Sequence, residues 1–259
     1  MTGPPAAPLP TPPDRRDPAA GDLRTRQALV VVLAGVSGAT DAIGLLALGG
    51  AFTSVMTGNL VLLGAASATA DGALALASGV AIVAFCLGVA LGTLLAGTPR
   101  PGDGAWPSRV TLGVAGEGAL LVVYAVGWWV SGADRGATAT LLLLATTAVA
   151  LGVQSSTVQR FGVSGLSTTF LTGTLTAIVV RLTTRRPLRE VLPSIQVIAG
   201  LVVGAAAGAA TVSSLPVAAP ALQLLLVGAV LLVALVRFPL RPRSPDPHRQ
   251  PTAGAQLSG

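Results

Sequence analysis

Long apolar runs separated by short polar segments make up most of the chain. A helix needs about 20 residues to cross the hydrocarbon core of a bilayer, with a range of about 17–25. Six runs meet this length easily, and the second and sixth are marginal. The runs also lack the alternation of a barrel wall. The pattern therefore predicts an all-α, polytopic membrane helix bundle with eight apolar helical segments. These lie at about 27–49, 51–69, 73–96, 109–131, 137–159, 166–182, 191–212 and 217–238.

The two ends of the chain differ from this membrane domain, which we place at residues 27–238. Residues 1–26 and 239–259 are rich in proline and arginine and have no apolar period, so we expect disordered tails. The first tail does not resemble a signal peptide, because the apolar stretch after it starts too late and runs too long. The single histidine, His248, lies in the second tail.

Composition supports the membrane interpretation. Of the 259 residues, 52% are hydrophobic and only 10% are charged, against about 25% charged in ordinary soluble domains. The mean hydropathy is +0.76 and the pI is about 11.4. A basic chain can bind nucleic acid, but these arginines cluster beside apolar runs, where membrane topology explains them better. The expected partner is the lipid bilayer, with no nucleic acid. The lone Cys86 excludes an intrachain disulfide and a cysteine metal cluster, and we expect no cofactor.

The arginines also indicate how the chain crosses the membrane. If all eight segments cross with the N-terminus inside, 13 of the 16 arginines are cytoplasmic. If the two marginal segments instead enter and return on the same side, 15 are cytoplasmic and only Arg135 is outside. Both arrangements obey the positive-inside rule and both place the two termini in the cytoplasm. We therefore expect a multi-pass protein of a bacterial plasma membrane, with the number of crossings left open.

The two marginal segments contain similar sequences, which we name the first and second Thr-Gly segments. They are "AFTSVMTGNLVLLG" at 51–64 and "LSTTFLTGTLTAIV" at 166–179. Upstream of them, "GVSGAT" at 35–40 is similar to "GVQSST" at 152–157. The order of the runs agrees with this match, so the sequence predicts two repeated halves, 27–131 and 137–238. Four crossings in each half would make the halves parallel, whereas three crossings and one re-entrant segment would make them inverted. Repeats of this kind are common in secondary transporters.

The same stretches resemble a known family. Its signatures are similar to "AGVSGATDAIGLLALGGAFTSVMTGNLVLLG" at 34–64 and "LGVQSSTVQRFGVSGLSTTFLTGTL" at 151–175. The chain resembles, from about residue 27 to 238, the YoaK-like family of bacterial integral membrane proteins, which is defined by a domain of unknown function (1275). The resemblance implies a bacterial integral membrane protein and supplies no established substrate.

Two acidic residues lie inside the apolar runs. Asp41 is in the last third of the first run, where a carboxylate costs about 2.5–3.5 kcal/mol and needs a partner, water or a proton. This predicts a site for a cation, a proton or a cationic substrate, and the alternative is a carboxylate wetted at the interface. Glu117 lies in the middle of the fourth run between Gly116 and Gly118, where a functional role and a packing role both remain open.

The remaining candidates are small and polar. Glycine permits departures from helical backbone, and backbone groups freed inside a membrane must face a cavity or protein. We therefore predict that the two Thr-Gly segments line one polar pathway, with Thr57 and Thr172 within roughly 15 Å. Asn59 and Asp41 should point into the same space. The alternative is tight packing, with each hydroxyl bonded to its own helix. The candidate residues in these segments and beside them are Thr57, Gly58, Asn59, Gln154, Thr172, Gly173 and Thr174.

Helix-packing faces are expected at Gly88 and Gly92 and at Gly200, Gly204 and Gly208, because GxxxG spacing lets helices approach closely. These faces are also candidates for contacts between copies in a homo-oligomer.

Enzymatic activity is not expected. "GVSG" at 35–38 and 162–165 is similar to the serine motif of intramembrane proteases, but that chemistry needs a histidine base. Neither an HExxH nor a Walker motif is present. The favoured function is a secondary transporter or channel for an unknown small solute. The alternative is a non-transporting scaffold or sensor, whose intramembrane polar residues only hold helices together.

Overall fold

Helices are the only regular elements in the part of the chain that the structure, a computed structural model, describes: residues 18–98, 103–161 and 171–238. The expected all-α bundle is confirmed. The eight α-helices are α1 (Pro18–Ala47), α2 (Met56–Ala68), α3 (Gly72–Ala96), α4 (Ser108–Ser131), α5 (Ala137–Gln159), α6 (Leu171–Thr183), α7 (Leu192–Ser214) and α8 (Ala219–Arg237). Two short 3-10 helices, η1 (Leu188–Glu190) and η2 (Pro216–Ala218), precede α7 and α8.

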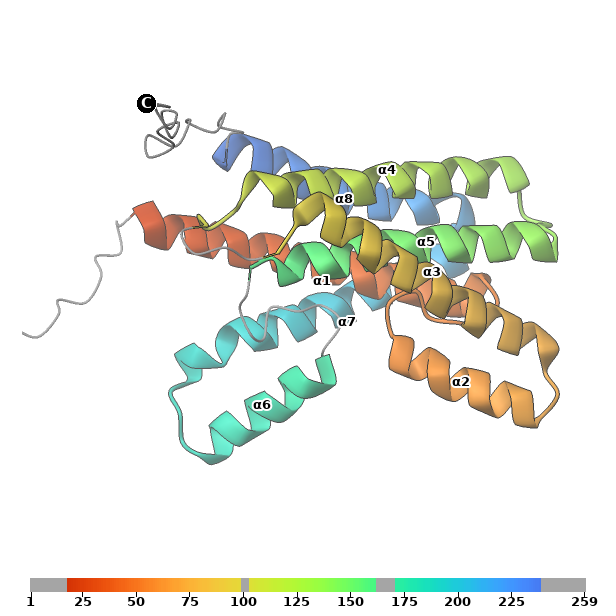
Figure 1. Ribbon diagram of the computed structural model, residues 1–259, viewed down its shortest axis with the longest axis horizontal. Coiled ribbons are helices and arrows are strands. Elements are labelled where there is room, and N and C mark those ends of the chain that lie inside the picture. The colour runs from red at the N-terminus through yellow and green to blue at the C-terminus, as the bar shows by residue number, and fades with distance from the viewer. Residues whose placement is uncertain (1–17, 99–102, 162–170, 239–259) are drawn as a thin grey trace, which may run out of the picture.

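Six of these helices, all except α2 and α6, are long and apolar enough to cross a membrane. The other two have 13 residues each, which corresponds to about 20 Å of helix. The hydrocarbon core is about 30 Å thick, so neither short helix covers it alone. In Figure 1, α2 lies beside α3 and α6 lies beside α7, with each short helix outside the central bundle. These lengths favour the arrangement with six crossings and two short segments.

The first helix begins earlier than expected. Residues 18–26 were assigned to the disordered tail, but α1 starts at Pro18. Proline is well suited to the first position of a helix, and the alanines, leucine and arginines that follow are good helix formers. The polar start of α1 therefore continues the membrane helix beyond the apolar run, which makes that part of the tail assignment wrong.

Two close helix pairs form the centre of the bundle. Helix α7 packs along α1, and α3 packs along α5, while α4 and α8 contact each other and complete the bundle (Figure 1). A β-carbon added at Gly204 would lie 2.6 Å from the Cα of Gly35, and one added at Gly152 would lie 2.9 Å from the Cα of Gly88. Only glycine permits helices to approach so closely, as in membrane helix pairs with small residues at the contact.

The glycine faces are thus internal. Gly88 and Gly92 contact the backbone of α5, and Gly204 and Gly208 contact the backbone of α1. The expectation that these faces pack helices is supported. The suggestion that they also join copies of the chain stays a prediction, although α5 and α1 already cover these glycines.

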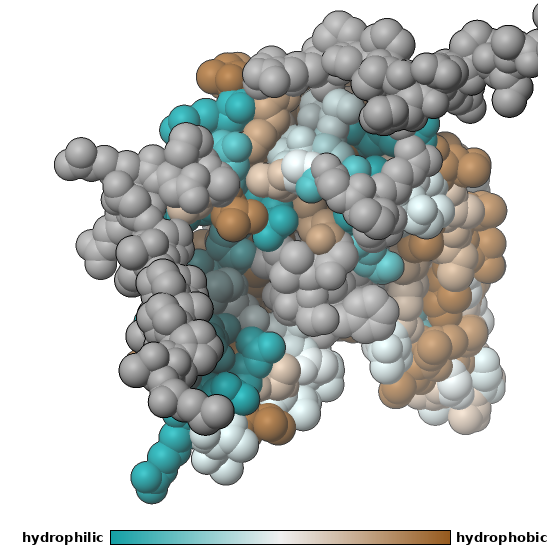
Figure 2. Space-filling model, turned by 60° about the vertical axis from the view of Figure 1, so that its left-hand side comes forward, coloured by the Kyte–Doolittle hydropathy of each residue, from teal (hydrophilic) through white to brown (hydrophobic). Residues whose placement is uncertain are grey.

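Aromatic residues mark the two ends of α4. At its C-terminal end, the indole nitrogens of Trp128 and Trp129 donate to the carbonyl oxygens of Pro216 (3.0 Å) and Val217 (2.8 Å). At its other end, Trp106 donates to Thr111 Oγ1 (2.9 Å). Tryptophan favours membrane–water interfaces. Figure 2 shows hydrophilic surface gathered at one end of the molecule and hydrophobic surface on its flank, as expected for a bundle that stands across a bilayer.

Candidate functional site

Asp41 anchors the loop between α1 and α2. The chain turns at Gly49 and Gly50, which have φ values of 93° and 79°, a conformation that favours glycine. The buried carboxylate then accepts four hydrogen bonds. Its Oδ1 accepts from the backbone nitrogens of Thr53 (2.7 Å) and Ser54 (2.7 Å) and from the Thr53 hydroxyl (2.9 Å), and its Oδ2 accepts from the Ser54 hydroxyl (2.6 Å). The carboxylate therefore finds its partners within the protein.

Asn59 fixes the same loop from α2. Its Oδ1 accepts from the backbone nitrogen of Phe52 (2.9 Å), and its Nδ2 donates to the carbonyl oxygen of Phe52 (2.7 Å). Asp41 and Asn59 thus hold three consecutive residues, 52–54, from two helices. The two side chains approach a common segment, as expected, but that segment is protein backbone rather than the lining of a cavity.

A polar stripe on α1 connects three parts of the bundle. Ser37, Thr40 and Asp41 are spaced to share one side of the helix. Gln154 of α5 donates through Nε2 to Ser37 Oγ (2.8 Å) and to the carbonyl oxygen of Leu33 (3.1 Å). Gln223 of α8 donates to Thr40 Oγ1 (2.8 Å). All of these side chains are buried, so α1 is joined by hydrogen bonds to α5, to α8 and to its own following loop.

Glu117 differs from the other buried polar residues. It lies near the middle of α4, is 0% exposed, and neither carboxyl oxygen has a hydrogen-bond partner among the described residues. Its glycine neighbours face other helices: Gly116 faces Leu95 of α3, and Gly118 faces Val227 and Leu231 of α8. A carboxyl group in such surroundings needs a proton, a cation or water as its partner.

The described parts of the two Thr-Gly segments lie in the loop before α2, in α2 and in α6. Thr57, Thr172 and Gly173 are exposed, Thr174 is buried, and the backbone of Gly58 lies against the Phe52 ring. Each short helix packs on the long helix that follows it, and in Figure 1 both short helices lie on the same, lower side of the bundle, with α6 toward the end where α1 begins and α2 toward the opposite end. The prediction that the two segments face each other across one pathway, with Thr57 and Thr172 within roughly 15 Å, stays a prediction. Residues 166–170, and "GVSG" at 162–165, lie outside the described residues.

Sequence reasoning missed several polar contacts. Thr53 and Ser54 were read only as part of a repeat, although they supply all four donors to Asp41. Gln223 was overlooked, although it is the only amide side chain in the last apolar run. A systematic search for isolated amides within apolar runs would have found it.

An apolar exterior, six long apolar helices and a buried polar stripe define a polytopic helical membrane protein. The family model described as "Protein of unknown function (DUF1275)" matches residues 29–236, and the chain belongs to this family. The chain is also similar to the UPF0700 transmembrane protein YoaK of Bacillus subtilis (strain 168), with 34% identity over 154 residues. That match covers 60% of this chain and 66% of the relative, slightly less than two thirds of its length. No solved structure matches the chain.

Proposed function

We propose that the protein is a secondary transporter or channel for a small solute, without enzymatic activity, and that Glu117 lies on its pathway. The observation that carries this proposal is the fully buried Glu117 carboxyl group, which has no hydrogen-bond partner among the described residues. Ionisable residues inside membrane spans are costly and commonly mark ion or substrate pathways. Proton or cation coupling through this carboxyl group would give it the missing partner.

Helix packing supports the repeat that such a function commonly uses. In such a repeat, α1 of the first half corresponds to α5 of the second half, and α3 corresponds to α7. The contact between α1 and α7 then corresponds to the contact between α5 and α3. The close approaches of Gly35 to Gly204 and of Gly152 to Gly88 fit this correspondence. Two inverted halves would then each contain three crossing helices and one short helix. In transporters with inverted repeats, the site lies near the middle of the membrane between the halves, which is the depth of Glu117 in α4.

A non-transporting scaffold or sensor is the second candidate. The hydrogen bonding of Asp41 and Asn59 favours it, because both side chains are used to hold a loop. Under this alternative, Glu117 would be a packing residue whose removal costs no function.

Glu117→Gln should reduce solute movement at least about tenfold if the carboxyl group binds a proton or cation. The loss of one hydrogen bond to a charged group, worth about 1.5–3 kcal/mol, corresponds to at least that factor. The measurement is uptake of a solute panel into proteoliposomes that contain a pH-sensitive dye. Asp134→Asn, at an exposed position, is the control and should transport like the wild type.

Glu117→Leu separates the two candidate functions. Replacing a buried ionisable group by an apolar one of similar size is often neutral or stabilising, so its melting temperature should equal or exceed that of the wild type. If the protein is a transporter, this variant should lose solute uptake. If it is a scaffold, the variant should keep the function of the wild type. Uptake at the wild-type rate in both Glu117 variants would remove Glu117 from the mechanism.

We also propose that both termini face the cytoplasm of a bacterial cell. The start of α1 and the end of α8 lie at the same end of the bundle (Figure 1). With six crossings, that end carries all the arginines of the described residues except Arg135, and positive charge favours the cytoplasmic side.

Cysteine labelling tests this topology. In a Cys86→Ser background, Ala73→Cys and Ala133→Cys should react with a membrane-impermeant maleimide on intact spheroplasts. Thr184→Cys, the control at an exposed position on the other side, should react only after lysis. An eight-crossing chain would instead place residues 73 and 133 inside, so protection of both cysteines before lysis would refute the six-crossing topology.

A further inference from the structure

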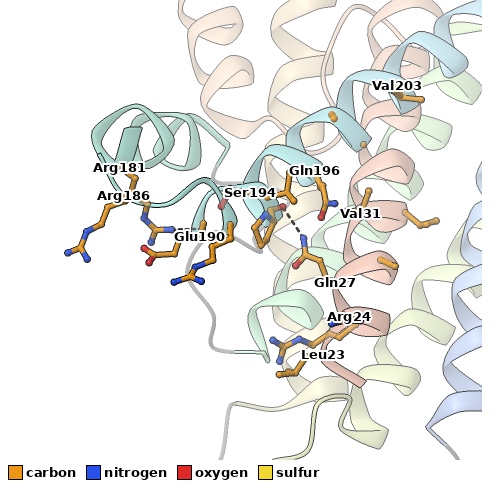
Figure 3. A pocket seen from close by; sticks show the side chains of 18 of the residues that line it. Leu23, Arg24, Gln27, Val31, Arg181, Arg186, Glu190, Ser194, Gln196 and Val203 are labelled. Atoms are coloured by element: carbon orange, nitrogen blue, oxygen red, sulfur yellow. Dashed lines mark hydrogen bonds between the residues drawn. The ribbon is translucent and has the colours of Figure 1, made fainter. Parts of the chain in front are cut away.

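A large groove lies where α1 begins and where η1 and α7 follow α6. Its volume is about 2100 Å³, which exceeds the roughly 300–1,000 Å³ of most small-molecule sites. Figure 3 shows its two sides: Arg181, Arg186 and Glu190 project from the α6–η1 region, whereas Arg24 lies on α1. Gln27 of α1 donates to the carbonyl oxygen of Pro193 (2.9 Å) and ties the two sides together.

The groove carries a strong excess of positive charge. Five arginines line the groove, and Glu190 is the single acidic residue among the residues that line it. None of these five arginines forms an ion pair with a carboxylate in the described ranges. The Arg181 guanidinium donates instead to the backbone carbonyl of Glu190 (3.2 Å). The arginines are Arg24, Arg26, Arg181, Arg186 and Arg189.

The remainder of the groove is apolar. Val31 and Val32 of α1, Val180 of α6 and Val203 of α7 line it. Val31 and Val203 lie in the apolar parts of two membrane spans, so this part of the groove is at the depth of lipid chains. The groove therefore combines a basic end with an apolar end. The positive-inside rule accounts for arginines near spans, but it does not require them to line a groove together with membrane-depth valines.

We propose that this groove binds an anionic phospholipid. The arginines would hold the lipid phosphate, since guanidinium groups form charge-assisted and often bidentate hydrogen bonds to phosphate. The valines would contact an acyl chain. Basic pockets between membrane helices on the cytoplasmic side bind acidic lipid headgroups in this way. A free phosphate ion would use the arginines alone and would leave the valine side without a ligand.

Lipid binding to the purified full-length protein tests the proposal. The probes are phosphatidylglycerol and phosphatidylcholine with identical acyl chains, measured by native mass spectrometry and by the shift in melting temperature. We expect phosphatidylglycerol to bind and to raise the melting temperature, with a smaller effect of phosphatidylcholine. Arg24→Gln combined with Arg186→Gln should weaken phosphatidylglycerol binding at least about tenfold, because two charge-assisted contacts are lost.

The matched control is Arg109→Gln combined with Arg237→Gln, which removes the same charge from exposed positions outside the groove. This pair should bind phosphatidylglycerol like the wild type. Equal weakening by both pairs would show general surface attraction and overturn the proposal. An equal rise in melting temperature with inorganic phosphate would overturn the lipid assignment in favour of a free-anion site.

A charge-conserving pair covers the case in which the glutamine variants fail to insert. Arg24→Lys combined with Arg186→Lys keeps the positive charge that sets topology but loses the planar bidentate donor. It should bind phosphatidylglycerol several-fold more weakly than the wild type. Unchanged binding in this pair would show that the two guanidinium groups do not hold the phosphate.

Discussion

Replacing Asp41 with alanine should lower the melting temperature of the protein by at least about 6 °C. The substitution leaves two backbone N–H groups and two hydroxyl groups of Thr53 and Ser54 without their acceptor in a buried loop. Removing one member of a buried charged network costs about 3–5 kcal/mol, and 1 kcal/mol corresponds to about 2–4 °C for chains of this size. Thermal unfolding in detergent, followed by tryptophan fluorescence, gives the measurement.

Asp41→Asn should be much milder. The amide keeps one oxygen for the backbone donors, and its nitrogen can donate to the Ser54 hydroxyl, so the loss should be about 1–2 kcal/mol. Asp71→Ala is the control, because that exposed carboxylate caps α3 through one bond to the Leu74 nitrogen (3.1 Å) and should cost about 1 kcal/mol. If Asp41→Ala were no more destabilising than Asp71→Ala, Asp41 would not anchor the loop.

Alanine at Gly204 should separate α7 from α1 and destabilise the bundle by about 2 kcal/mol or more. The added β-carbon would meet the backbone of Gly35, and overpacking typically costs 1–3 kcal/mol even where side chains can yield. Backbone atoms yield less than side chains do. Gly88→Ala should have a similar effect, since its β-carbon would meet the backbone of α5 at Val149.

Gly228→Ala is the matched control in the middle of α8. A β-carbon there has no neighbour within 4 Å, and alanine is the better helix former by about 1 kcal/mol, so this variant should be neutral or slightly more stable. The measurement is thermal unfolding of all three variants in one detergent. A clear difference between the losses at Gly204 and Gly88 would argue against the correspondence of the two halves.

The sequence predicted the elements of the fold well because lipid imposes a simple length rule. Apolar runs near 20 residues became helices with bounds close to those expected, and the marginal runs became the short helices α2 and α6. The start of α1 was misjudged because a helix that leaves the membrane no longer needs apolar residues. Glycine spacing correctly indicated close contacts, but spacing alone does not tell whether the partner helix belongs to the same chain.

The candidate site was harder to predict, because a sequence shows which polar residues exist but not which partners they find. The sequence shows that burying the Asp41 carboxylate is costly. Its hydrogen-bond donors, the backbone nitrogens of Thr53 and Ser54, could not be predicted because they depend on the path of the loop after α1. Glu117 was given no clear role, and the structure distinguishes it through its unpartnered carboxyl oxygens. The resemblance between the Thr-Gly segments predicts that they face each other, and this stays a prediction because residues 166–170 lie outside the described residues.

The position of α1 at the centre of the bundle has a consequence for biogenesis. Asp41 can bond to Thr53 and Ser54 almost as soon as they emerge from the ribosome. Gly35 must wait for Gly204 of α7, and Thr40 must wait for Gln223 of α8. Because translation adds about 5–20 residues per second, the interval between the synthesis of α1 and that of α7 and α8 is roughly ten to thirty seconds. During that time the first helix lies in the membrane without α7 and α8, and the Thr40 hydroxyl bonds only to the Val36 carbonyl oxygen of its own helix (2.7 Å). The contacts of the first helix are therefore complete only when the last helix has been made, and we expect the nascent chain to be most sensitive to membrane proteases at this helix.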